Sequence, residues 1–205
     1  HHYWTGRSED MMPFADNGGR ASEIIGAVLN VQLGRLPGMI EAMRTQRARI
    51  VEGTRHLDNL GLRLAPVHSP DHDVAAHVIY NLPSAEAAAT FAGVCPSVIA
   101  GKTGRHTYVD WDQVLMGQGA GHPAMNPYNM EANKDCRHSY SKDMCPRSLD
   151  ILGRTVMIPM NPELSEDDAV QTIRNIEAGA RVAAGEITRD QAEVKQVDKI
   201  DPRKY

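Results

Sequence analysis

The apolar positions near the N-terminus recur at helical spacing. They share one face of a helix: Ile25, Val28, Leu29 and Leu36. Ser22 stands where an N-cap is expected, because its hydroxyl can accept a hydrogen bond from a free backbone N–H of the first turn. The pattern therefore predicts a helix that starts at Ser22 and is interrupted by Pro37-Gly38.

A second amphipathic helix is predicted after that interruption. Its apolar side consists of Met39, Ile40 and Met43, and its polar positions are Arg44, Arg47 and Arg49. Glycine is common just past a helix end, so we expect this helix to end near Gly53 or Gly61.

A small α/β pattern follows. Residues 72–83 alternate well enough to predict a strand. Residues 84–94 predict a helix capped by Ser84, and residues 96–104 predict a short strand. This order of strand, helix and strand is typical of a two-layer α/β domain.

Residues 105–154 are irregular and rich in Gly, Pro, Asn and His. A loop of this length in a compact domain is either functional or disordered, and its ring content disfavours disorder. The rings are His106, Tyr108, Trp111, His122, Tyr128, His138 and Tyr140.

Regular structure is predicted again towards the C-terminus. Residues 145–152 indicate a turn into a short helix, and residues 154–160 indicate a strand. Residues 165–183 predict a helix capped by Ser165, with three acidic residues in its first turn. The charged residues 187–205 predict a loose terminus or a partner contact.

Composition narrows the class of protein. The chain has 205 residues, 41% of them hydrophobic, and a net charge of −4, so nothing indicates nucleic-acid binding. The chain has three irregularly spaced cysteines, Cys95, Cys136 and Cys145. An odd number at irregular spacing is typical of proteins from a reducing cytoplasm. No apolar run reaches the ~18 residues of a membrane span, and no signal peptide is recognisable. The start "HHYWTGRSED" leads us to expect that the chain begins partway through a longer protein.

Three motifs resemble one known family. They are "NGGRASEIIGAVLNVQLGRLPGMIEAMRTQRARI" (17–50), "TGRHTYVDWDQVLM" (103–116) and "CPRSLDILGRTVMIPMNPELSEDDAVQTIRNI" (145–176). In this order the motifs are similar to the C-terminal portion of the DegT/DnrJ/EryC1/StrS sugar aminotransferases. The resemblance runs from about Asn17 to Ala183, which is most of the chain.

The resemblance implies part of a fold-type I enzyme that uses pyridoxal 5'-phosphate. Such an enzyme moves an amino group from glutamate or glutamine to a keto sugar or cyclitol, and works as a homodimer with shared active sites. Residues 1–53 would end the large cofactor domain and form a linking helix, 54–183 the small α/β domain, and 184–205 a charged tail. The Schiff-base lysine lies upstream in the family, so this chain would carry no catalytic residue.

The resemblance assigns cofactor contacts to Asn17, Gly18 and Arg20, at the start of the first helix. In the family this segment reaches the cofactor phosphate of the neighbouring subunit. The family places its Asn two residues before the Arg, which is Gly18 here. Either Asn17 substitutes through a bulge, or the backbone N–H groups of Gly18 and Gly19 bind the phosphate. Without the resemblance, a turn, a capped helix and a solvated Arg20 explain the segment.

Substrate contacts are expected from His106, Tyr108 and Trp111. Spaced by two and three, these side chains would line a sugar-binding wall by stacking and hydrogen bonding. The alternative is ordinary packing of an amphipathic loop.

Two further functions are possible from the residues alone. A non-catalytic small domain would bind a sugar or a protein partner, and the missing lysine favours it. A metal-binding domain would use Cys136, His138 and Cys145, although this is not a standard zinc spacing. Lys142 resembles a solvated surface lysine, and the neighbouring Asp143 would oppose the low pKa that a Schiff-base lysine needs.

Overall fold

The structure is a computed structural model that describes residues 22–104, 107–120, 122–136 and 139–195. Contacts divide the chain into two units. The described residues 22–103 and 147–195 form the first unit, which holds the sheet. Described residues of 104–146 belong to the second unit. These units do not test the predicted division into a large domain, a small domain and a tail.

The first helix, α1, is continuous over Glu23–Thr54. The Ser22 hydroxyl accepts from the Ile25 backbone N–H at 3.3 Å, so the predicted N-cap is confirmed. The predicted interruption at Pro37-Gly38 is wrong, because α1 runs through Pro37. A proline inside a helix removes one hydrogen bond and costs about 3 kcal/mol. Here α1 continues through Pro37 although Gly34 and Gly38, which are poor helix formers, lie close to it, and all three residues are exposed.

A four-stranded antiparallel sheet with the order β1-β2-β4-β3 lies in the first unit. The strands are β1 (Arg63–Leu64), β2 (His77–Asn81), β3 (Val98–Ile99) and β4 (Thr155–Pro159). The predicted strands within 72–83, 96–104 and 154–160 are confirmed, whereas β1 was not predicted. A two-residue edge strand has too few positions to show an alternating pattern.

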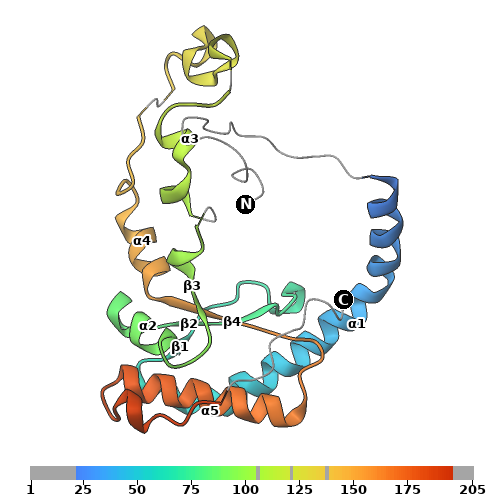
Figure 1. Cartoon of the computed structure of the whole chain (residues 1–205), viewed down its shortest axis with the longest axis vertical. Helices are drawn as coiled ribbons and strands as arrows, with labels where there is room; N and C mark the ends of the chain where they lie inside the picture. The colour runs from blue at the N-terminus through green and yellow to red at the C-terminus, as the bar shows by residue number, and fades with distance from the viewer. Residues whose placement is uncertain (1–21, 105–106, 121, 137–138, 196–205) are drawn as a thin grey trace. The chain divides into compact units, whose positions relative to one another are not determined.

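One face of the sheet forms the core. Val78 and Tyr80 of β2 are buried, as are Val156 and Ile158 of β4. Three helices pack on this face: the second half of α1, α2 (Ala85–Ala92) and α5 (Glu166–Ala183). Figure 1 shows the C-terminal half of α1 running beside α5. This arrangement confirms the predicted mixed α/β class. The sheet is open and antiparallel, which the sequence did not predict.

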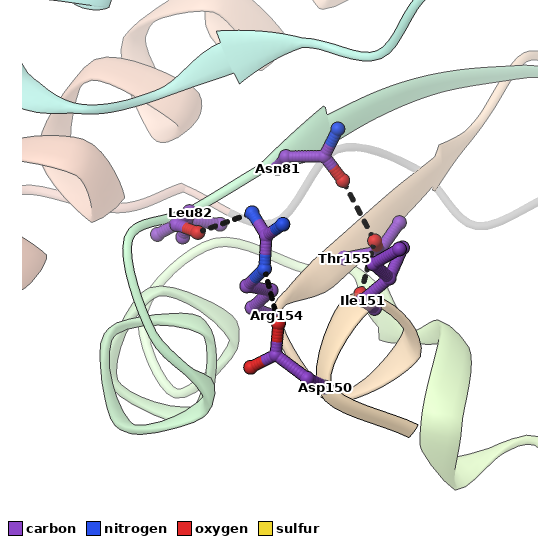
Figure 2. A network of polar contacts seen from close by, with 6 residues as sticks. All are labelled: Asn81, Leu82, Asp150, Ile151, Arg154 and Thr155. Carbon is purple, nitrogen blue, oxygen red and sulfur yellow. Dashed lines mark hydrogen bonds and ion pairs between the residues drawn. The ribbon is translucent and has the colours of Figure 1, made fainter. Parts of the chain in front are cut away.

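The short helix α4 (Pro146–Gly153) leads directly into β4 and is tied to β2 (Figure 2). The Thr155 hydroxyl lies 2.7 Å from Asn81 Oδ1 and 2.6 Å from the Ile151 carbonyl oxygen. The Arg154 guanidinium donates to Asp150 at 3.1 Å and to the Leu82 carbonyl at 3.4 Å. These bonds fix the angle at which the chain enters the sheet.

Part of the predicted tail is bound to the fold. The Arg189 guanidinium donates to the Gly93 carbonyl at 2.6 Å. The buried Asn175 amide donates to the Lys195 carbonyl at 2.8 Å and accepts from the Lys195 N–H at 3.3 Å. The prediction of a loose terminus is therefore wrong for residues 187–195. Hydrogen bonds from Arg189 to the Gly93 backbone and between Asn175 and the Lys195 backbone hold this segment against the fold.

The second unit consists of short turns, as its composition predicted. Its only α-helix within the described residues is α3 (Asp112–Leu115). The Asn126 side chain donates to the Gly117 carbonyl at 2.7 Å and accepts from the Gly119 N–H at 3.2 Å. Side-chain to backbone bonds of this kind replace a regular ladder and hold the loop together. None of the helices in the described ranges is long and apolar enough to cross a membrane.

Candidate functional site

The residues predicted to bind the cofactor lie outside the described part of the chain. They are Asn17, Gly18 and Arg20, and the predicted substrate residue His106 also lies outside it. Their roles stay predictions. What the structure describes is the helix start that follows them, where Ser22 caps α1.

Tyr108 is the first residue of a short 3₁₀ turn, Tyr108–Asp110, in the second unit, and Trp111 directly follows this turn. The Tyr108 hydroxyl donates to the Lys142 carbonyl at 2.7 Å and accepts from the Cys145 N–H at 3.2 Å. This hydroxyl thus connects two segments of the loop. Trp111 is 45% exposed. The predicted substrate contacts of both residues remain predictions.

The structure describes two of the three side chains of the alternative metal site. Cys136 and Cys145 are exposed free thiols, and His138 lies outside the described residues. Across the described ranges, no group of three or more His, Cys, Asp or Glu side chains is placed to hold a metal ion.

The described lysines do not fit covalent attachment of pyridoxal phosphate. They are all exposed: Lys102, Lys134, Lys142 and Lys195. A lysine that forms a Schiff base is activated by burial or by a cationic neighbour, which lowers its pKa. No catalytic step through the cofactor therefore follows from the described residues.

The structure brings together a different group of side chains in the first unit, which we call the arginine pocket. It is an open pocket of about 430 Å³ between α1 and the loop 70–75. Its lining residues are Arg44, Arg47, Ala48, Val51, Glu52, Arg55, Pro70, Asp73 and Ala75. Positions 44, 47 and 51 recur every three or four residues on one face of α1, and Arg55 directly follows the end of this helix.

Backbone carbonyls hold Arg44 in place. Its Nε donates to the Asp73 carbonyl oxygen at 2.7 Å and its Nη2 to the Asp71 carbonyl oxygen at 2.8 Å. Carbonyl oxygens are neutral acceptors, so these bonds fix the guanidinium without cancelling its charge. The loop that supplies them contains Ala75 in the left-handed region, with φ of 57°, a conformation that costs a residue with a Cβ about 1–2 kcal/mol.

Arg47 is incompletely paired. Its Nη1 lies 3.9 Å from Asp73 Oδ2, which is an ion pair but too long for a hydrogen bond. Its Nε is buried and has no hydrogen-bond partner among the described residues. A buried donor left without a partner costs about 1–3 kcal/mol, so the pocket contains a cation whose bonding capacity is only partly used.

Sequence reasoning missed the arginine pocket. Arg44 and Arg47 were assigned to the polar side of a helix, as solvated charges usually are. Their spacing was a visible signal that they share a face with Arg55. The alternating pattern of residues 72–83 predicted a strand from residue 72, whereas β2 begins at His77 and residues 70–72 form a 3₁₀ turn. The loop that lines the pocket was therefore not predicted.

Comparisons with protein-family models, with curated proteins and with solved structures find no match for this chain.

Proposed function

We propose that the chain is the C-terminal portion of a pyridoxal-phosphate-dependent sugar aminotransferase. The enzyme would transfer an amino group from glutamate or glutamine to a keto sugar or cyclitol. The sequence support is the order of the three motifs between Asn17 and Ile176. The described fold, a long helix followed by a small sheet domain with helices on one face, is compatible with the small domain that the resemblance implies.

One structural observation supports this proposal most directly. The two halves of α1 have opposite environments: Ile50 is fully buried in the core, whereas the first half exposes its large apolar side chains. The exposed residues are Ile24, Ile25, Val28, Leu29, Val31, Leu33 and Leu36. A contiguous exposed apolar surface usually marks an interface. A helix that links a large and a small domain would be apolar at both ends in this way.

The described residues would then have supporting roles. When bound, the cofactor supplies the electron sink for amino transfer. The Schiff-base lysine would come from the preceding domain, because every described lysine is exposed. In this proposal the helix start around Arg20 contacts the cofactor phosphate of a second subunit. Tyr108 and Trp111 would orient the sugar, and Trp111 is 45% exposed.

Absorbance spectroscopy on the product of the complete reading frame tests the proposal. We expect a visible band of bound pyridoxal phosphate that L-glutamate or L-glutamine removes, with an aminated sugar formed when a keto sugar is added. Arg20→Ala should weaken cofactor retention or raise KM. The matched control is Arg35→Ala, because Arg35 is an exposed residue of α1 that donates to Gln32 at 3.2 Å, three residues away. A full-length protein that neither retains the cofactor nor transfers an amino group would refute the proposal.

The exposed lysines also favour a second candidate, a non-catalytic domain that binds a sugar or a protein partner. The same experiment separates the two functions. Sugar binding measured by calorimetry, without cofactor retention in the full-length protein, would support the non-catalytic domain.

A further inference from the structure

We propose that the arginine pocket binds a small organic oxyanion, a phosphate ester or a carboxylate with an apolar body. The proposal rests on residues of the first unit and does not depend on the aminotransferase activity. The arginine pocket lies on the second half of α1, and the predicted cofactor residues precede that helix.

The charge of the arginine pocket favours an anion. Its lining contains three arginines against two carboxylates, Glu52 and Asp73. Glu52 pairs with Arg55 at 2.8 Å, but both side chains are at least 70% exposed, and such surface pairs are weak. An incoming oxyanion can therefore displace Glu52 from Arg55 at little cost.

The two inner arginines are already placed for binding. Two carbonyl oxygens fix the Arg44 guanidinium, which lowers the entropy lost when a ligand is bound. No hydrogen bond joins Arg47 to a carboxylate within the described residues, and its side chain is 21% exposed at the pocket. A guanidinium matches the planar edge of a carboxylate or phosphate with two parallel N–H groups.

An adjoining pocket provides space for an apolar body. This second pocket, of about 510 Å³, shares Val51 and Arg55 with the arginine pocket. Its other lining includes Leu62, Leu64 and Tyr80. The two pockets are adjacent at Val51 and Arg55. We expect a ligand with its anionic group at the arginines to extend its body past these two residues towards the apolar side chains, which favours an organic oxyanion over a bare inorganic ion.

Titration of this chain followed by NMR tests the site. The probes are inorganic phosphate and phenyl phosphate, added at constant ionic strength with chloride as the balancing ion. We expect the Arg47 Nε–Hε correlation to shift saturably, and phenyl phosphate to bind several-fold more tightly. A shift absent with both probes would overturn the site. Equal affinity for the two probes would overturn the assignment of the apolar body.

Substitutions of single arginines distinguish binding at the arginine pocket from general charge attraction. Arg44→Gln should weaken phenyl phosphate binding about tenfold or more, because a hydrogen bond to a charged group is lost. Arg55→Gln, on a side chain 75% exposed, should fold normally and weaken binding by a smaller factor. The control is Arg49→Gln, whose guanidinium pairs with Glu166 at 3.0 Å away from the pocket. An Arg49→Gln loss equal to that of Arg44→Gln would refute the site.

Discussion

The hydroxyl groups of Thr54 and Tyr80 lie 2.6 Å apart in the core, where the end of α1 meets the central strand β2. The Thr54 hydroxyl is also 2.7 Å from the Ile50 carbonyl oxygen, which can only accept. Since a hydroxyl has a single hydrogen, Thr54 donates to Ile50 and Tyr80 donates to Thr54. The helix end and the sheet are therefore joined by a directed chain of hydrogen bonds.

This relationship predicts different costs for two substitutions. Thr54→Val should lower the free energy of unfolding by about 1–3 kcal/mol, because it leaves the buried Tyr80 hydroxyl without its partner. Tyr80→Phe should cost only about 1 kcal/mol, because Thr54 keeps its bond to Ile50. Urea unfolding of both single variants and the double variant measures the coupling. A coupling energy of zero would contradict the hydrogen-bond chain.

Cys95 predicts a loss of stability at alkaline pH. Burial raises the pKa of its thiol from 9.0 to about 12. The unfolded thiol releases its proton above pH 9 while the folded thiol retains it. The folded state therefore binds more protons, and stability falls as pH rises between about 9 and 12. Cys95→Ala should flatten this part of the curve of unfolding free energy against pH. An unchanged slope would contradict the burial of the thiol.

Two glycines in helices should respond oppositely to alanine. A Cβ at Gly179 would lie 3.0 Å from Cys95 Cβ and 3.0 Å from a ring carbon of Phe91, both buried. Gly179→Ala should therefore destabilise by about 1–3 kcal/mol through overpacking, despite the better helix propensity. At exposed Gly34 nothing lies within 4 Å of a Cβ, so Gly34→Ala should stabilise by about 0.5–1 kcal/mol. Thermal unfolding of both variants measures the difference in sign.

The hydrogen bonds of the Asn175 side chain should protect the Lys195 amide from hydrogen exchange. Asn175→Ala removes both hydrogen bonds to the Lys195 backbone, so the Lys195 amide should exchange with solvent much faster. Global stability should fall by about 2 kcal/mol. The control is Gln171→Ala, which removes one side-chain bond to Asn175 at 2.9 Å and leaves the backbone pairing intact. Equal exchange rates at Lys195 in both variants would contradict the docking.

Local signals in the sequence predicted the helix starts. Ser22, Ser84 and Ser165 each accept a hydrogen bond from the backbone N–H three residues later, which is a property of four consecutive residues. The strand order could not be read in this way. β3 pairs with β4 and not with β2, although β2 precedes it along the chain. That pairing depends on the shared burial of Ile99 and Val156, which are far apart in sequence.

The candidate sites also differ in whether local sequence motifs or contacts between distant residues define them. The cofactor and substrate residues were proposed from motifs, and of these the structure describes only Tyr108 and Trp111. The arginine pocket depends on Arg44 reaching carbonyl groups 27 and 29 residues away. Such contacts depend on the path of the loop between β1 and β2, which the local pattern of its residues did not reveal.

The continuity of α1 through Pro37 gives the protein a fixed spacer. A helix of 32 residues is about 48 Å long, and each residue turns it by about 100°. One residue inserted between Pro37 and Arg44 would rotate the exposed apolar residues of the first half of α1 by about 100° relative to the sheet. The composition of the exposed half and of the sheet would stay the same. Contacts made by the exposed half of α1 should therefore be more sensitive to a change in the length of the helix than to single substitutions along it.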